Sequence, residues 1–177
     1  LRFTTSVLPA ADLGPENPLP QLASNVDLHS GSAGKDENFG KVNGCLPYTI
    51  QDGYNREKKQ RAFKTVVLEN ETLRVTFFIE TGGRLWSLVH KPSGRELLHA
   101  NPVFQPANLA IRNAWISGGV EWNCGIIGHT PFTCSPLFAA RAEMDDGTPV
   151  LRMWEWERIR QAVFQIDAFL PDGSPVL

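Results

Sequence analysis

The residues best suited to chemistry lie in one glycine-rich stretch, Ile116–Pro131, in which four of the sixteen residues are glycines. Glu121 and His129 can each give or take a proton. Asn123 can hydrogen-bond to hydroxyl groups, and Trp122 offers a flat apolar surface for a sugar ring. We therefore interpret Glu121 and His129 as candidate catalytic residues, and the other two as candidate binding residues for an uncharged, polyhydroxylated ligand, a carbohydrate. A glycine-rich connection whose polar groups cap strand ends explains the same residues equally well.

For two of the charged candidates, Glu121 and Arg84, a purely structural role is the alternative to a functional one. Desolvation beside an indole is expected to raise the pKa of Glu121, which would suit it to acid or base catalysis. A strand-end carboxylate paired with an arginine is the competing interpretation. Arg84 follows Gly82 and Gly83 and is a candidate substrate-binding residue, because it can reach a sugar hydroxyl or carboxylate. A buried ion pair with Glu80 or Glu121 accounts for it as well.

The composition narrows the classes of partner. A formal net charge of −2 argues against a surface for nucleic acid or for an anionic membrane. No apolar run approaches the roughly 20 residues of a membrane span, and the first residues do not resemble a secretory signal. Three cysteines without a CxxC pair predict free thiols, and with them a cytoplasmic location.

Neither a metal site nor a cofactor is predicted. His29, His90 and His99 are not spaced like metal ligands. The tripeptide Asn70–Thr72 matches a glycosylation sequon, but it lies in a short polar break between two apolar runs. Such a break predicts the turn of a hairpin.

Residues 1–60 differ in composition from the rest of the chain. Four prolines fall between positions 9 and 20, and positions 24–44 are rich in serine, glycine, aspartate and asparagine. No helical or strand period lasts beyond a few residues, so this stretch is predicted to be an extended arm or linker. Apolar residues such as Phe39 and Tyr54 favour an arm laid across another surface. Within it, Leu46–Ile50 is predicted as an edge strand.

Residues 61–177 are predicted to form a β-sandwich domain. Apolar residues alternate with others from Leu73 to Glu80, the pattern of a strand with one buried face. Further strands are predicted at 63–68, 84–90, 95–99, 114–123, 136–143, 149–158 and 163–170. Many short strands, with no long amphipathic helix, indicate an all-β fold, an antiparallel β-sandwich. Trp154 and Trp156 share one face of a strand, which we interpret as core rather than as a platform for sugar rings.

Several motifs carry a resemblance to known families. Leu68–Asn70, Leu73–Val75, Gly82–Leu88 and Lys91–Leu98 resemble the opening of the galactose-mutarotase-like supersandwich. Asn101–Val103, Pro106–Leu109, Trp115–Asn123 and His129 resemble a bacterial domain family of unknown function that is often found N-terminal to tetratricopeptide repeats. The resemblance covers roughly residues 45–177. One departure is that relatives often show a longer histidine-bearing run after the asparagine, where this chain has Cys124–Gly128 and a single histidine.

The resemblance implies a carbohydrate-facing sandwich of which this chain is the N-terminal part. Mutarotase-like enzymes move a proton at the anomeric centre with a histidine and a carboxylate, and glycosidases on this fold use carboxylate pairs. A catalytic carboxylate is therefore expected beyond residue 177. Three function classes follow: an enzyme that acts on carbohydrate, epimerase-like or glycoside-processing; a non-catalytic sugar-binding module; and a protein-interaction scaffold. The expected partners are a carbohydrate and a downstream tetratricopeptide-repeat region, and an uncovered sheet edge also allows self-association.

Overall fold

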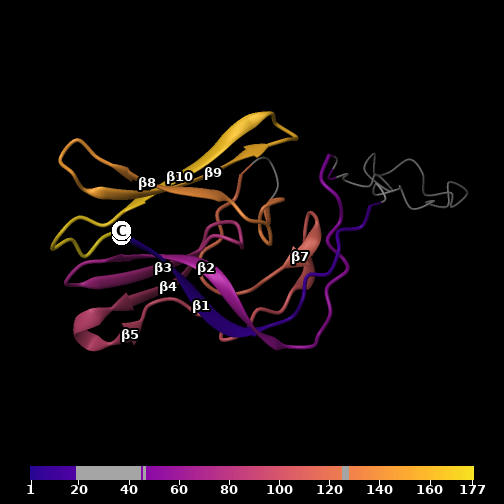
Figure 1. Cartoon of the computed structure of the whole chain (residues 1–177), viewed down its shortest axis with the longest axis horizontal. Helices are drawn as coiled ribbons and strands as arrows, with labels where there is room; N and C mark the ends of the chain where they lie inside the picture. Colours follow the sequence, from indigo (N-terminus) through magenta and orange to yellow (C-terminus); the bar gives the residue numbers. More distant parts are fainter. Residues whose placement is uncertain (19–44, 46, 125–127) are drawn as a thin grey trace, which may run out of the picture.

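The computed structural model describes residues 1–18, 45, 47–124 and 128–177 (Figure 1). The regular elements of this part are β1 (Arg2–Ala10), β2 (Lys59–Glu69), β3 (Leu73–Phe78), β4 (Arg84–His90), the 3₁₀ turn η1 (Lys91–Ser93), β5 (Arg95–Glu96), β6 (Ala107–Ala110), β7 (Asn113–Trp115), β8 (Phe138–Glu143), β9 (Pro149–Glu157) and β10 (Ala162–Phe169). The strands form three antiparallel sheets, in the orders β1-β2-β3-β4-β5, β10-β9-β8 and β6-β7. The predicted all-β sandwich class is confirmed. None of the described residues belongs to a helix long and apolar enough to cross a membrane.

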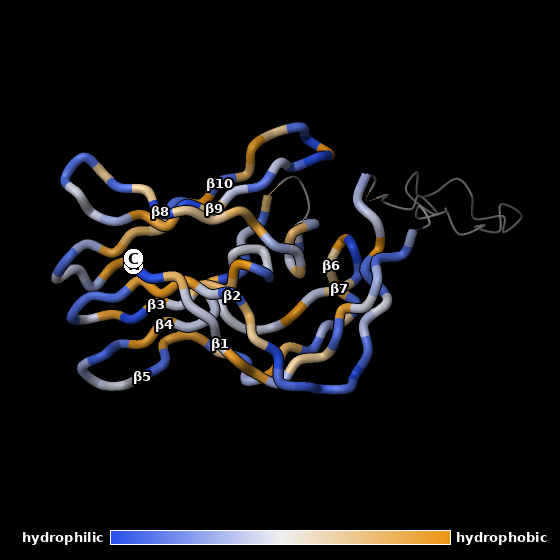
Figure 2. The backbone as a smooth tube through the Cα atoms, viewed as in Figure 1, coloured by the Kyte–Doolittle hydropathy of each residue, from blue (hydrophilic) through white to orange (hydrophobic). Residues whose placement is uncertain are grey.

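The main core lies between the two larger sheets, which face each other in Figure 1. Leu73, Val75 and Phe77 of β3 are buried in the same apolar cluster as Leu151 and Met153 of β9. Full burial of one such side chain contributes about 1.5–3 kcal/mol. Figure 2 shows the same division along the backbone, with apolar residues in the strands and hydrophilic residues at the outer turns. In β3 the period of two in the sequence separates the residues that join this core from their neighbours.

The opposite face of the five-stranded sheet is also covered. Phe63 of β2, Phe78 of β3 and Trp86 of β4 form a second buried cluster with Phe104, which lies between β5 and β6. The rings of Phe78 and Trp86 stack with their centroids 4.3 Å apart and their planes 11° apart. Because both faces are buried, alternation ends at the neighbours Phe77 and Phe78, which are both inaccessible.

The N-terminal stretch begins with a strand rather than with the extended arm that its composition suggests, and its residues 19–44 lie outside the described residues. β1 pairs with β2 along its whole length, from Arg2 opposite Val67 to Ala10 opposite Lys59. Residues 2–10 are therefore an edge strand of the sheet, and the boundary expected at residue 60 falls inside β2. The strand was hard to recognise because only its last part is buried. The edge strand predicted at 46–50 is absent over 47–50, and residue 46 lies outside the described residues.

The strand predicted over 114–123 is wrong beyond its first two residues. β7 ends at Trp115, and β6, which the sequence did not suggest, pairs with it. Gly118 and Gly119 both have positive φ, at 99° and 65°, so the chain turns where a strand was expected. A side chain at Gly119 would collide with the carbonyl oxygen of Leu85. The glycine pair therefore brings the following residues close against β4.

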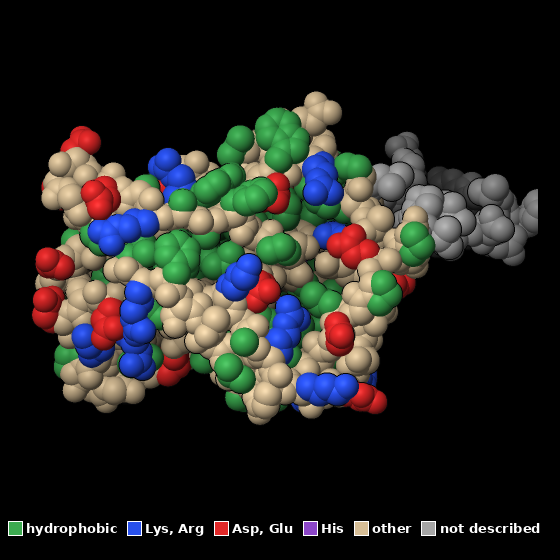
Figure 3. Space-filling model, viewed as in Figure 1, with side chains coloured by type: hydrophobic (Ala, Val, Ile, Leu, Met, Phe, Trp, Pro, Cys, Tyr) green, Lys and Arg blue, Asp and Glu red, His purple; other side chains and the backbone are tan. Residues whose placement is uncertain are grey.

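The interpretation of Trp154 and Trp156 as core is also wrong. Leu151, Met153 and Glu157 of β9 are buried, whereas Trp156 on the opposite face is 48% exposed. Figure 3 shows apolar side chains reaching the surface over the three-stranded sheet. Alternation separates the two faces of a strand without saying which one is inside. Glu157 can be buried because its carboxylate accepts hydrogen bonds from the hydroxyl of Tyr48 and from two backbone amides.

Asn70 closes the turn between β2 and β3, as its sequence context predicts. Its Oδ1 accepts hydrogen bonds from the backbone amides of Thr72 and Leu73. Its Nδ2 donates to the carbonyl oxygens of Pro171 and Ser174, at 2.7 and 2.8 Å. One buried carboxamide therefore ties the hairpin of the large sheet to the turn that follows β10.

Candidate functional site

The carboxylate of Glu121 lies at the centre of a hydrogen-bonded cluster. The indole Nε1 of Trp115 donates to its Oε2 at 2.9 Å, and Nδ1 of His129 lies 2.9 Å from the same oxygen. The hydroxyl of Thr133 donates to Oε1. Nη2 of Arg84 lies 3.7 Å from Oε2. The side chain of Glu121 is only 13% exposed, so the four groups replace most of its water.

These contacts set the ionisation state of Glu121. Burial raises its pKa, but the hydrogen bonds from Thr133, His129 and Trp115 and the charge of Arg84 outweigh burial, so the pKa lies below its ordinary value. The raised pKa expected from the sequence is therefore wrong. The carboxylate is ionised at neutral pH and acts as an acceptor. Glu121 is thus suited to hold a cationic or N–H-bearing partner rather than to supply a proton.

His129 is the most accessible member of the cluster. Its side chain is 38% exposed. Because the ionised Glu121 can only accept, Nδ1 of His129 is assigned as the donor, and in that tautomer of an imidazole Nε2 is the acceptor. The ring meets Trp115 edge-on, with centroids 5.4 Å apart. A carboxylate that orients one ring nitrogen of a partly exposed imidazole is an arrangement that general bases use.

The backbone of His129 is held in an unusual conformation. Its φ is +59°, in the left-handed region that residues other than glycine rarely adopt. Its amide donates to Oδ1 of Asn123 at 2.9 Å. The candidate binding residue Asn123 therefore uses its acceptor to fix the histidine. Left-handed residues other than glycine often mark functional loops, since surrounding contacts must maintain them.

Trp122 is placed differently from the expected sugar platform. Its indole Nε1 donates to the carbonyl oxygen of Gly83 at 2.8 Å. The ring packs, partly buried, against the main core. Of the two neighbouring indoles, it is Trp115 that contacts His129.

Arg84 is an internal support rather than an accessible ligand contact. Its side chain is 2% exposed, and Nη1 donates to the carbonyl oxygen of Gly118 at 2.8 Å. Burial lowers its pKa, and the charge of Glu121 opposes that effect. Of the two carboxylates that the sequence offered as partners, Glu121 pairs with Arg84, whereas Glu80 pairs with Arg61 at 3.6 Å. Arg84 therefore balances the buried charge of Glu121.

Four of the five candidate site residues predicted from the sequence lie together in the structure, and two further residues of the cluster were not predicted. Arg84, Glu121, Asn123 and His129 form one connected set. Thr133 and Trp115 were not foreseen. No periodic or motif signal distinguishes Thr133 in its loop, and nothing in the sequence around Trp115 shows that its indole nitrogen is directed at Glu121.

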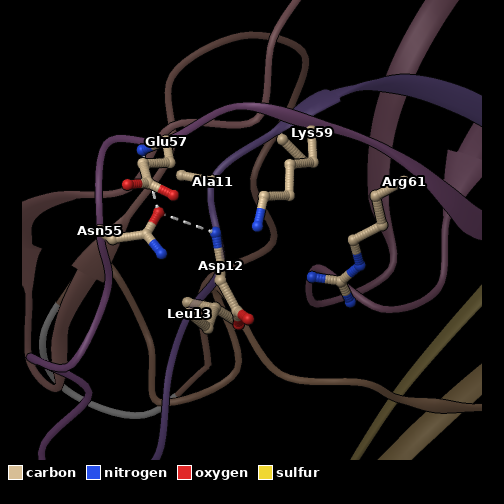
Figure 4. A pocket seen from close by; sticks show the side chains of 8 residues that line it. Ala11, Asp12, Leu13, Asn55, Glu57, Lys59 and Arg61 are labelled. Carbon is tan, nitrogen blue, oxygen red and sulfur yellow. Dashed lines mark hydrogen bonds between the residues drawn. The ribbon is translucent and has the colours of Figure 1, made fainter.

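Two cavities of about 370 Å³ each lie elsewhere in the described structure. Figure 4 shows the first, where Lys59 and Arg61 of β2 extend towards Asp12 and Asn55 binds the backbone amides of Asp12 and Glu57. The second cavity is lined by Glu16, Pro47, Tyr48, Thr49, Arg112, Phe132, Ser135, Pro136, Glu155 and Arg158. Neither lining includes Glu121 or His129. Among the described residues, no three histidine, cysteine or acidic side chains are grouped as a metal site requires.

Comparison with known proteins gives a family and a fold. The model of a family described as "Domain of unknown function (DUF5107)" matches residues 40–177. A solved structure, of a TPR-domain containing protein from Parabacteroides distasonis ATCC 8503, superposes with a TM-score of 0.78 at 21% identity. The match covers 98% of this chain and 27% of that protein. The resemblance to a domain family of unknown function associated with tetratricopeptide repeats is confirmed.

Proposed function

Since this chain belongs to the DUF5107 domain family, for which no function is known, we propose a function from its side chains: the domain binds a carbohydrate beside His129, which transfers a proton at the anomeric centre. The observation that carries this proposal is the 2.9 Å contact between Nδ1 of His129 and the ionised Glu121, with the imidazole itself partly exposed. Glu121 is then a positioning residue, and His129 is the catalytic one.

The reaction that suits one oriented imidazole is exchange of the anomers of an aldose. Nε2 of His129 removes the proton of the anomeric hydroxyl, the electron pair forms the C1 carbonyl, and the bond between C1 and the ring oxygen breaks. The ring oxygen gains a proton from a second acid, supplied by solvent or by the longer protein. Rotation about C1–C2 and the reverse steps close the ring as the other anomer. A contribution of about 10²–10⁴-fold is typical of such a base.

The supporting groups suit this task. The buried Arg84 and the hydrogen bonds from Trp115 and Thr133 keep Glu121 ionised, so it stabilises the protonated ring of His129 as the proton arrives. Asn123 holds the backbone of His129 in place. The side chain of His129 is 38% exposed, so a polar substrate can approach it from solvent.

The test measures anomer exchange by NMR for a panel of aldoses, in the whole protein, with His129→Gly as the main variant. Glycine accepts the left-handed backbone at this position, so the substitution adds no backbone strain. We expect anomer exchange in the wild type, its loss in His129→Gly, and partial recovery when imidazole is added. Unchanged turnover in His129→Gly, or no aldose that is exchanged by the wild type, would exclude the proposal.

A second candidate is a domain that serves a helical repeat region, either as a sugar-binding module or as an interaction scaffold. It is favoured by the solved structure, a TPR-domain containing protein of which this chain matches 27%. If the domain is a sugar-binding module, the wild type binds the sugar without turnover, and His129→Gly abolishes that binding. A scaffold would be indifferent to His129→Gly and to Glu121→Gln, and its association with the repeat region would persist in both variants.

A further inference from the structure

The second cavity, of about 370 Å³, is lined by two arginines and two glutamates. Arg112 comes from the turn between β6 and β7, Glu155 from β9, Arg158 from the residue after β9, and Glu16 from the segment that follows β1. The aromatic rings of Tyr48 and Phe132, with centroids 5.9 Å apart, form an apolar part of the cavity wall. The elements that build the cavity thus come from distant parts of the sequence.

Arg112 is fixed and directed into this cavity. Its side chain is only 6% exposed. Nε donates to the carbonyl oxygen of Thr49 at 2.7 Å, and Nη1 donates to the hydroxyl of Ser135 at 2.9 Å. These bonds leave Nη2 as the group that meets Glu16, at 2.6 Å from its Oε1. A buried guanidinium with a fixed orientation is a strong site for a carboxylate.

Glu16 occupies this position from the solvent side. Its side chain is 52% exposed, whereas its carboxylate binds Arg112 and accepts a hydrogen bond from the hydroxyl of Thr49. Burial raises the pKa of Glu16, but the hydrogen bonds from Thr49 and Arg112 and the charges of Arg112 and Arg158 outweigh burial and lower it. Arg112 makes the ion pair with Glu16, and the charge of Arg158 adds a smaller effect in the same direction. Because most of the side chain is outside, an incoming carboxylate can compete for the same place.

We propose that this cavity is a binding site for a small carboxylate ligand, whose carboxylate replaces that of Glu16 at Arg112, in the cavity that Arg158 also lines. In the free protein Glu16 neutralises the buried Arg112 and keeps the site closed to weak ligands. The site uses neither Glu121 nor His129, so it does not depend on the proton-transfer function. A sugar acid and a non-sugar carboxylate share this chemistry, and the probes below distinguish them.

The test is calorimetric titration of the whole chain with D-glucuronate, glutarate and, as the uncharged counterpart, D-glucose. We expect carboxylate binding in the wild type and a dissociation constant about tenfold lower in Glu16→Ala, because the internal competitor is gone. Arg158→Ala should weaken binding. Arg160→Ala, which removes an exposed arginine two residues away that does not line the cavity, should not. Glu16→Gln keeps the length of the side chain but removes its charge, so it should also lower the dissociation constant of the carboxylate ligand.

Each outcome decides the proposal. Binding of glucuronate alone supports a sugar-acid site, and binding of both carboxylates supports a site for small carboxylates in general. Equal affinity in wild type and Glu16→Ala, equal binding of glucose and glucuronate, or no saturable binding of either carboxylate would overturn it.

Discussion

Arg84 and Glu121 form an ion pair that is almost removed from solvent, with side chains 2% and 13% exposed and 3.7 Å between Nη2 and Oε2. Replacing Glu121 by glutamine leaves the guanidinium buried without its counter-charge. Removing one partner of such a pair costs roughly 3 kcal/mol. We expect this loss in the free energy of unfolding of Glu121→Gln, measured by urea denaturation at pH 7.

The matched control for that variant is Glu143→Gln on β8. Glu143 pairs with Arg141 at 3.0 Å, but both side chains are more than half exposed. Exposed pairs contribute little, so the midpoint in urea should not move. Equal effects of the two substitutions would show that burial of the Arg84–Glu121 pair is unimportant.

The same carboxylate predicts a pH dependence. The folded pKa of Glu121 lies below its ordinary value of 4.5, so the unfolded chain binds its proton first as the pH falls. Its contribution to stability is therefore complete at neutral pH and is lost as the pH falls below about 4.5 towards the folded pKa. Denaturation curves of the wild type and Glu121→Gln should converge at low pH. A constant difference between pH 7 and pH 3 would contradict this.

Gly119 offers a test of the turn that brings Glu121 against β4. Gly119→Ala must place a methyl group against the carbonyl of Leu85 at a φ of +65°. Gly94 has nearly the same φ, +68°, but nothing within 4 Å of an added Cβ. We expect about 1 kcal/mol of destabilisation for Gly94→Ala and about 3 kcal/mol or more for Gly119→Ala, read from thermal unfolding. Similar losses would mean that the backbone angle alone matters.

β9 allows the two faces of one strand to be compared directly. Met153→Ala removes a fully buried side chain and should cost roughly 2–5 kcal/mol. Trp156→Ala removes a larger but half-exposed side chain on the other face and should cost about 1 kcal/mol or less. Urea denaturation followed by circular dichroism measures both. A larger loss for Trp156→Ala would place that indole in a packed interface.

The sequence predicted β3 and β4 for different reasons. In β3 the apolar residues alternate as far as Phe77, whereas β4 was recognisable because Gly82 and Gly83 precede it and a turn at Lys91–Gly94 follows it. Sequence reasoning failed for β1, which is buried only at its end, and for residues 116–123, where two glycines turn the chain despite apolar neighbours. It also could not orient β9, since Trp154 and Glu157 are placed by contacts made with other segments.

In the candidate site, too, the sequence predicted the local contacts better than the long-range ones. Glu121, Asn123 and His129 are close in sequence, so their meeting in space is a local consequence of the glycine-rich loop. Arg84 was accessible to sequence reasoning because a glycine pair precedes it. The lowered pKa of Glu121 was not, because Thr133 and Trp115 contribute to it through contacts without a sequence pattern. The pairing of Glu16 with Arg112 joins residues far apart in the chain and has no sequence signal at all.

The double role of Asn70 bears on the order in which the chain folds. Its Oδ1 bonds reach residues two and three positions away, and these need only the β2–β3 hairpin. Its Nδ2 bonds reach residues 101 and 104 positions away. Closing a loop of that length carries an entropic cost that must be met before such contacts stabilise anything. We therefore expect the Oδ1 bonds of Asn70 to form with the β2–β3 hairpin, early in folding, and its Nδ2 bonds to form late, when the turn after β10 reaches that hairpin.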